Sequence, residues 1–155
     1  MKLLEEKLNI ESITVMIQKE VADRLTETPG GKNTGAITYC VYYYAEAQEV
    51  LTVPNTSFVP EPKVCSEVIK LNIRKEPPVA LKDEKIFFKV VKASFMQRRK
   101  TLLNALTNTK VFVSKEEGTQ ILKTLNLNEN VRAEELSLQD FANITKMIMG
   151  KEEQK

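Results

Sequence analysis

The pattern of apolar residues changes at one proline-rich segment, and this change limits the possible folds more than any other feature. Residues 76–83 read EPPVALKD, a composition typical of a linker between domains. Before this segment, short apolar runs suited to strands alternate with helical patterns, which predicts an α/β domain. After it, the apolar patterns have helical spacing. The sequence therefore predicts an α/β domain over 1–78, a small helical domain over 83–150 and a disordered tail over 151–155.

Three segments are predicted to be strands, and the other patterned segments are predicted to be helices. The first strand has the apolar character of a buried strand in a parallel sheet, and the third alternates between two phases. Residues 36–48, AITYCVYYYAEAQ, fit either a strand or a helix, and we predict a helix. The strands are SITVMIQ (12–18), EVLTVPN (49–55) and VCSEVIKLNIRK (64–75). The other helices are MKLLEEKLN (1–9), KEVADRLTE (19–27), EKIFFKVVKASF (84–95), RRKTLLNALTN (98–108), and two with capping-box spacing at Ser114…Glu117 and Ser137…Asp140.

The composition excludes several kinds of protein. The chain has no histidine, which removes the usual general base and the commonest metal ligand. Its two cysteines form no disulfide framework, so we expect a reducing, cytoplasmic setting. No apolar run has membrane-spanning length, and the first residues are too acidic for a signal peptide.

Positive charge is concentrated in one block of the sequence. Residues 82–110 hold eight basic and two acidic residues, a net charge of +6, whereas 1–81 and 111–155 each have a net charge of −2. Arg98, Arg99 and Lys100 lie at or just before a predicted helix start, where positive charge is unfavourable. A bound phosphate would resolve this conflict, and so would an acidic partner elsewhere in the fold. The block is therefore either a nucleic-acid contact or an ordinary solvated face.

Phe58 begins the stiff segment FVPEPKVCS, in which two prolines should favour an extended backbone. A ring held in this way could stack on a nucleobase, or it could belong to the hydrophobic core. QKE (18–20) follows the first predicted strand at the end where α/β sheets bind ligands, but it also suits an ordinary helix start. PGGKNTG (29–35) matches neither the dinucleotide-binding nor the Walker pattern.

Five segments, taken together and in order, resemble the ribosomal RNA adenine dimethyltransferases, also called dimethyladenosine transferases. They are MIQKEVADRL (16–25), PGGKNTGAIT (29–38), SFVPEPKVCSEVIKL (57–71), FMQRRKTLLNAL (95–106) and RAEELSLQDF (132–141). The resemblance extends to about Met147 and is greatest to the bacterial branch that dimethylates two adjacent adenines near the 3′ end of small-subunit ribosomal RNA. One departure is Thr34, where the family usually has a tyrosine.

The resemblance implies that residues 1–78 are the C-terminal strands and helices of a Rossmann-like methyltransferase sheet. The family's cofactor-binding half would precede residue 1, so the chain resembles a C-terminal fragment. S-adenosylmethionine is the cofactor of the full-length enzymes. We expect this chain alone not to bind it and to be inactive, and we expect no metal.

The resemblance also assigns roles to residues. Phe58 matches the aromatic residue that stacks on the flipped target adenine. Expected RNA contacts are Arg98, Arg99, Lys100, Lys63, Lys32 and Gln97. The expected partner is small-subunit ribosomal RNA or the immature small subunit, with no membrane contact. Sheet edges left open by missing strands could also cause self-association. The alternative function is a non-catalytic RNA-binding or ribosome-assembly module.

Overall fold

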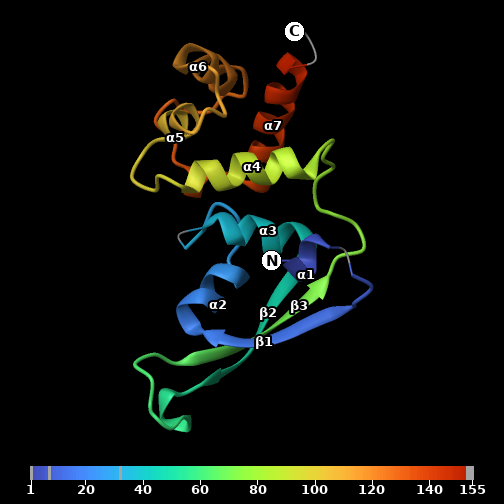
Figure 1. The fold of residues 1–155 in the computed structure, drawn as a ribbon, viewed down its shortest axis with the longest axis vertical. Helices are drawn as coiled ribbons and strands as arrows, with labels where there is room; N and C mark the ends of the chain where they lie inside the picture. Colours follow the sequence, from blue (N-terminus) through green and yellow to red (C-terminus); the bar gives the residue numbers. More distant parts are fainter. Residues whose placement is uncertain (1, 7, 32, 153–155) are drawn as a thin grey trace. The chain divides into compact units, whose positions relative to one another are not determined.

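The computed structural model describes residues 2–6, 8–31 and 33–152. Lys32, an expected RNA contact, and 153–155 of the expected tail lie outside these residues. The chain divides into two compact units. The sheet unit comprises 1–28 and 33–77, and the helical unit comprises 29–32 and 78–155. Figure 1 shows the helices and strands of both units.

The sheet unit contains a three-stranded sheet with strand order β1-β3-β2, in which both pairings are antiparallel. Its elements are α1 (Lys2–Glu5), β1 (Ser12–Gln18), α2 (Lys19–Thr26), α3 (Ala36–Tyr44), β2 (Ala45–Val53), the 3-10 turn η1 (Asn55–Ser57) and β3 (Ser66–Ile73). The α/β class is thus confirmed, and all three predicted strands are present. The prediction of a parallel setting for β1 is wrong within the described residues, because its neighbour β3 is antiparallel.

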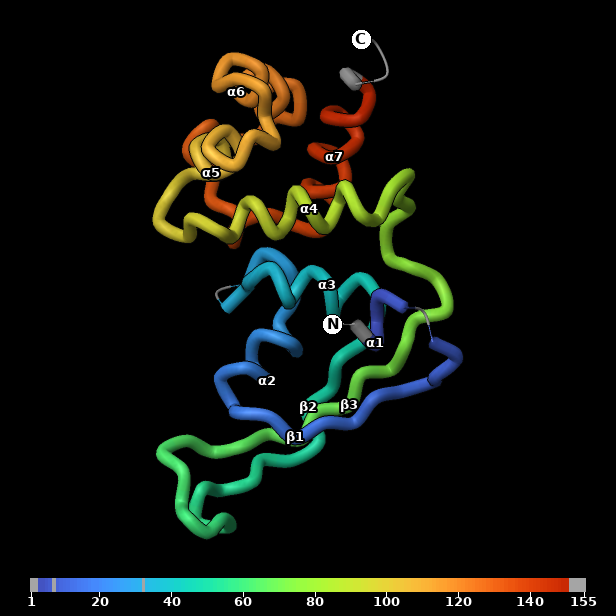
Figure 2. Tube along the Cα trace, viewed as in Figure 1, coloured from blue at the N-terminus to red at the C-terminus, as the bar shows by residue number. Residues whose placement is uncertain are grey.

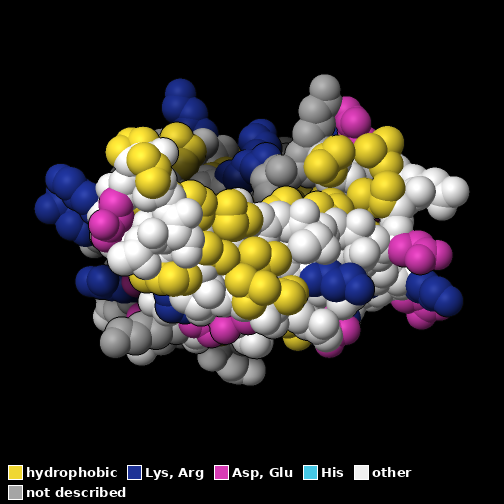
Figure 3. Space-filling view, turned by 90° about the horizontal axis from the view of Figure 1, so that it is seen from below, with side chains coloured by type: hydrophobic (Ala, Val, Ile, Leu, Met, Phe, Trp, Pro, Cys, Tyr) yellow, Lys and Arg dark blue, Asp and Glu magenta, His cyan; other side chains and the backbone are white. Residues whose placement is uncertain are grey.

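Helices α2 and α3 cover one face of this sheet (Figure 2). The core between them consists of small and branched apolar residues. Ala22 and Leu25 of α2 and Val41 of α3 pack with Ile69 and Leu71 of β3. The other face carries the opposite phase of each strand and includes exposed apolar side chains, which gather in the view of Figure 3.

The ambiguous segment 36–48 contains the boundary between a helix and a strand. Helix α3 ends at Tyr44 and β2 begins at Ala45, so the predicted helix is right over 36–44 and wrong over 45–48. The strand forms because Ala45, Glu46, Ala47 and Gln48 pair in register with β3. Tertiary pairing here outweighs the helix propensity of alanine and glutamate.

The helical unit contains α4 (Glu84–Phe95), α5 (Leu102–Asn108), α6 (Lys115–Thr124), the 3-10 turn η2 (Ala133–Glu135) and α7 (Leu138–Glu152). Its core is rich in phenylalanine and leucine. The largest fully buried side chains are Phe87, Leu102, Leu106, Phe112, Ile121, Leu122, Leu136, Phe141 and Ile144. Helix α7 continues through residues 151 and 152, which belong to the segment predicted as a tail.

The predicted capping boxes differ in completeness. At the start of α7, Asp140 N donates to Ser137 Oγ at 3.1 Å and Ser137 N donates to Asp140 Oδ2 at 2.9 Å, so this box is confirmed. At the start of α6, Glu117 N donates to Ser114 Oγ at 3.2 Å. The carboxylate of Glu117 accepts instead from Val113 N at 2.7 Å, one residue before the N-cap.

Candidate functional site

The loop between β2 and β3 is fixed in shape by the side chain of Asn55. Its amide donates to Glu61 Oε1 at 2.7 Å and to the carbonyl oxygen of Pro62 at 3.3 Å. The backbone N–H of Phe58 donates to the carbonyl oxygen of Asn55 at 3.2 Å. These bonds close the loop on itself. Residues 58–60 form a bend, although the backbone of Phe58 is itself extended, so the extended segment predicted over 59–62 is interrupted at its start.

Phe58 is half-buried on this loop and does not belong to the core cluster between α2, α3 and the sheet. The next residue, Val59, is fully exposed, and Lys63 is exposed on the same loop. The loop therefore presents an aromatic ring and a cation on one braced projection. The stacking role of Phe58 and the RNA contact of Lys63 stay predictions.

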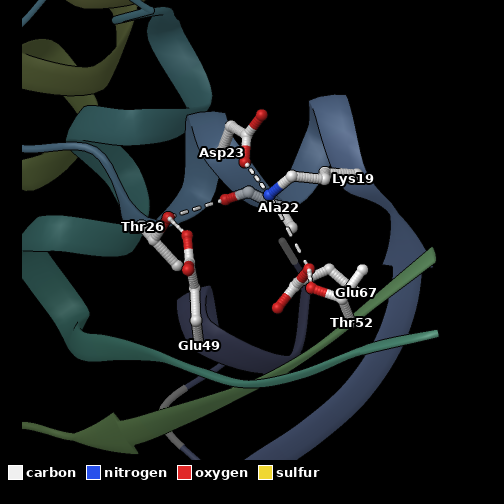
Figure 4. Close-up of polar contacts among 7 residues, drawn as sticks. All are labelled: Lys19, Ala22, Asp23, Thr26, Glu49, Thr52 and Glu67. Atoms are coloured by element: carbon white, nitrogen blue, oxygen red, sulfur yellow. Dashed lines mark hydrogen bonds and ion pairs between the residues drawn. The ribbon is translucent and has the colours of Figure 1, made fainter. Parts of the chain in front are cut away.

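A buried carboxylate lies beside the base of this loop (Figure 4). The Glu67 side chain is 3% exposed, and its Oε2 atom accepts from Thr52 Oγ1 at 2.8 Å. The Lys19 ammonium lies 3.7 Å from the same oxygen and 3.1 Å from Asp23 Oδ1. Lys19 thus sits between one buried and one exposed carboxylate at the point where β1 becomes α2.

These carboxylates stabilise the charged form of Lys19. The hydrogen bond to Asp23 has the largest effect and raises the pKa of the Lys19 ammonium above its usual 10.5. The charges of Asp23, Glu67 and Glu49 act in the same direction. Lys19 therefore carries a positive charge at the carboxyl end of β1 at neutral pH.

Sequence reasoning noted Lys19 within QKE but missed Glu67 and Thr52. The available clue was the alternation along β3. Glu67 falls on the same face of the strand as Cys65, Ile69 and Leu71, which is the apolar face. A carboxylate in the apolar phase of an alternating strand predicts a paired buried charge. Thr52 could be found only with the strand register, which places it opposite Glu67.

Both ends of the β2–β3 loop are attached to this end of the sheet. The register pairs Ser66 with Gln18 of β1 and with Val53 of β2. The backbone N–H of Lys19 donates to the carbonyl oxygen of Cys65 at 3.0 Å. The lysine–carboxylate cluster and the loop that carries Phe58 are therefore parts of one local structure.

Thr34, which precedes Gly35 at the end of the glycine-rich loop, is fully buried. Its hydroxyl donates to the carbonyl oxygen of Thr28 at 3.3 Å, which closes the glycine-rich loop across its base. Within that loop Gly30 has a φ of +91°, a backbone conformation that favours glycine. Thr34 thus has a structural role in this loop.

The three adjacent cations of the helical unit lie in an exposed turn between α4 and α5. Helix α5 begins at Leu102, with Thr101 as its N-cap, so the three cations lie just before the helix start, and the helix predicted over 98–108 is too long at its N-terminal end. The turn is shaped by Lys100 N donating to the carbonyl oxygen of Gln97 at 2.8 Å. Gln97 Oε1 accepts from Asn108 Nδ2 at 2.8 Å. Among the residues that the structure describes, none is an acidic partner of the three cations.

A row of lysines on α4 leads to this turn and was not identified from the sequence. Lys85, Lys89 and Lys92 are exposed and follow each other at helical spacing, which places them on one side of α4. Lys82, just before the helix, is also exposed. We call these four lysines and Arg98–Lys100 the basic surface. The clue in the sequence was that these lysines follow each other three or four residues apart within the basic segment 82–110.

Several other kinds of site receive no support within the described ranges. There, no group of histidine, cysteine or acidic residues could hold a metal ion, and no helix is long and apolar enough to cross a membrane. Neither Cys40, which is buried, nor Cys65 forms a disulfide. Three features of the candidate site remain. They are the β2–β3 loop over residues 54–65, called the braced loop; the Lys19 cluster of Lys19, Asp23, Thr52 and Glu67; and the basic surface.

Two solved structures share the fold of this chain. A crystal structure of a dimethyladenosine transferase from Plasmodium falciparum superposes with a TM-score of 0.76 at 22% identity, covering 97% of this chain and 62% of that one. The crystal structure of the 23S rRNA methyltransferase ErmE gives a TM-score of 0.64 at 18% identity, covering 96% and 59%. At these identities the likeness concerns the fold alone.

Sequence comparison identifies nearer relatives. Ribosomal RNA small subunit methyltransferase A of Geobacillus thermodenitrificans is 49% identical over 152 residues, and that of Clostridioides difficile is 45% identical over 151 residues. These alignments cover 96% and 97% of this chain but only 52% of each relative, so the chain spans about half their length. The family model described as ribosomal RNA adenine dimethylase matches residues 1–149. The chain therefore belongs to the ribosomal RNA adenine dimethylase family.

Proposed function

We propose that this chain is part of an S-adenosylmethionine-dependent methyltransferase that dimethylates two adjacent adenines near the 3′ end of small-subunit ribosomal RNA. Support comes from its membership of the family over residues 1–149. In this proposal the chain contributes RNA and target-base contacts. Alone it binds RNA but transfers no methyl group, because it spans only about half of its relatives.

The residues present do not fit S-adenosylmethionine. Nucleotide-like cofactors in α/β sheets bind where a strand passes through a glycine-rich turn into a helix. In the described structure β1 passes directly into α2 through Gln18 and Lys19, without a glycine. The Lys19 ammonium is held there by Asp23 and Glu67.

The basic surface contacts the RNA backbone in this proposal. The observation that carries it is the exposed turn of Arg98, Arg99 and Lys100, which has no acidic partner among the described residues. Exposed cations at helical spacing along α4 extend the same surface. Phosphates would neutralise this charge and release counterions, which makes such binding strongly dependent on salt.

The braced loop holds the target base. A base must leave its stack to react, and an aromatic side chain can stack on the extruded base. Phe58 provides the ring, and Lys63 provides a cation on the same loop for a neighbouring phosphate. The hydrogen bonds of Asn55 keep this loop in one conformation, so little ordering is needed when the base arrives.

The test of the RNA contact is the binding of this chain to a hairpin of the small-subunit RNA 3′ end, measured by fluorescence anisotropy at several salt concentrations. The variant is Arg98→Ala/Arg99→Ala/Lys100→Ala. The matched control is Lys115→Ala/Lys123→Ala/Arg132→Ala, which removes the same charge from exposed positions of the same unit. The slope of log affinity against log salt should flatten by about 0.7–0.9 for every phosphate that the variant no longer neutralises.

We expect weaker binding and a flatter slope for the first variant, with little change for the control. Equal losses in both variants would mean that only net charge matters and would refute a specific surface. Unchanged binding in the first variant would refute the contact outright. Melting curves of both variants exclude unfolding as the cause.

A non-catalytic RNA-binding module is the second candidate, because the chain spans only about half of its relatives. This module would use the same RNA contacts without methyl transfer. The half of a relative that this chain does not match is called the unmatched half. Joining it to this chain and assaying the RNA for dimethyladenosine distinguishes the two functions, because only the enzyme forms this product.

A further inference from the structure

The helical unit contains a cavity between α7 and the segment that leads into α4. Its volume is about 260 Å³, and its walls come from residues 80–83 and from one side of α7. Gln139, Asn143 and Lys146 follow each other along that side at helical spacing, and all three line the cavity. Sites for drug-sized ligands measure about 300–1,000 Å³. The cavity therefore suits a smaller ligand, of the size of a single nucleotide.

Two side-chain amides in this cavity are held together. Gln139 Nε2 donates to Asn143 Oδ1 at 3.0 Å. This bond leaves the Gln139 side-chain oxygen as an acceptor and the Asn143 side-chain nitrogen as a donor. The edge of a nucleobase also places a donor next to an acceptor, and asparagine and glutamine amides pair with such edges. The two amides can therefore bind the edge of an unpaired base.

The other uncharged and acidic polar groups of the cavity have structural roles. Asp83 Oδ1 accepts from Lys85 N at 2.7 Å and from Ile86 N at 3.1 Å, which caps α4. Thr145 Oγ1 donates to the carbonyl oxygen of Phe141 at 2.8 Å, within α7. The amide pair is thus the part of the cavity best suited to recognise a polar ligand.

The charge of the cavity favours a ligand with a phosphate. Lys82 and Lys146 line it, and together they outnumber the carboxylate of Asp83. Lys82 also begins the basic surface, so the cavity adjoins one end of that surface. Leu81 and Met149 add apolar wall, against which the flat face of a base can pack.

We propose that this cavity binds one unpaired nucleotide of RNA, with its base against Gln139 and Asn143 and its phosphate near Lys146. This inference rests on the RNA binding proposed above and deepens it. Phosphate contacts along the basic surface position RNA of any sequence, whereas a base in the cavity adds a sequence preference. An acidic peptide fits less well, because carboxylates only accept hydrogen bonds and leave the Gln139 oxygen unpaired.

The test follows the side-chain amide signal of Asn143 by nuclear magnetic resonance in the whole, isotope-labelled chain. The probes are the four ribonucleoside 5′-monophosphates, ribose 5-phosphate, which lacks the base, and acetate, all at millimolar concentrations. We expect at least one nucleotide to shift the signal saturably and to bind at least about fivefold more tightly than ribose 5-phosphate. Gln139→Leu should remove this preference for the base. The matched control Gln120→Leu, at another exposed helical glutamine of the same unit, should keep it.

Three results would overturn the proposal. The first is that no nucleotide shifts the Asn143 signal. The second is that ribose 5-phosphate or acetate binds as tightly as every nucleotide, which would make the cavity a site for anions only. The third is that Gln139→Leu, folded by its melting curve, keeps the preference as the control does. Nucleotide binding by a chain that fails to bind the RNA hairpin would instead refute the proposed function and leave the ligand class of the cavity standing.

Discussion

Gly118 is predicted to be required by packing, although it lies inside helix α6, where glycine is unfavourable. Replacing a mid-helix glycine by alanine usually stabilises a protein by roughly 0.5–1 kcal/mol. Here a Cβ atom would lie 2.5 Å from Leu103 Cδ1, 2.5 Å from Phe112 Cδ2 and 2.9 Å from Phe112 Cε2. Carbon atoms prefer separations of about 3.5–4.0 Å. The added methyl group must therefore displace its neighbours by about 1 Å.

Neither neighbour can move easily, because Leu103 is 4% exposed and Phe112 is 1% exposed. Overpacking of this kind costs about 1–3 kcal/mol, and the contact with two buried side chains places Gly118→Ala in the upper part of that range. After subtracting the gain in helix propensity, we expect a net loss of about 1–2 kcal/mol in the free energy of unfolding.

Urea unfolding of the whole chain, followed by circular dichroism, measures this loss. Gly150→Ala is the matched control, because Gly150 also lies in a helix but nothing lies within 4 Å of its added Cβ. The control should leave stability unchanged or raise it slightly. If Gly118→Ala stabilises the chain as much as the control does, the packing of α6 against Leu103 and Phe112 is wrong.

Three further predictions concern the site. Phe58→Ala should weaken RNA binding by roughly five- to 150-fold with little change in melting temperature, and Phe58→Trp should restore part of the lost affinity. A lower melting temperature in these variants, with Phe58→Trp the least stable, would place Phe58 in the core. Thr52→Val, which removes a donor to the buried Glu67 carboxylate, should cost about 1–3 kcal/mol in urea unfolding, and Thr52→Ser much less; equal costs would show that the hydroxyl is irrelevant. The pKa of Lys19 is raised above 10.5 on folding, so its stabilisation is complete below pH 10.5 and is lost as pH rises through the folded value. The urea midpoint of the unaltered chain should therefore fall as pH rises above 10.5, and Lys19→Met should lack this part of the fall. A dependence of the midpoint on pH that is the same in both proteins would contradict the pairing.

The sequence predicted local structure well where a single pattern dominated. Alternation in 64–75 predicted β3, and the serine-led spacing predicted the start of α7. It failed at 45–48, where pairing with β3 turns a helix-forming sequence into a strand. It also failed at the start of α5, because Thr101 caps the helix after the cations. The first failure depends on pairing with a strand distant in sequence, whereas the second depends on a local cap, because Thr101 Oγ1 accepts from Asn104 N in the first turn of α5.

The candidate site was predictable in part. Charge alone located the basic block, but the lysine row on α4 requires knowing where that helix faces solvent. The phase of β3 could have shown Glu67 as a buried charge, whereas its partners Thr52 and Lys19 depend on register and on the turn from β1 into α2. Asn55 gave no local indication that it braces the loop around Phe58.

The most direct test of the proposed function is the mass of small-subunit RNA after incubation with a restored enzyme. This chain is joined in one polypeptide to the unmatched half of the Geobacillus thermodenitrificans protein and supplied with S-adenosylmethionine and immature small subunits. We expect two adjacent adenines near the 3′ end to gain two methyl groups each, and the Arg98→Ala/Arg99→Ala/Lys100→Ala variant to be much slower. A polypeptide that folds, binds S-adenosylmethionine and RNA, and leaves the RNA mass unchanged would contradict the proposal.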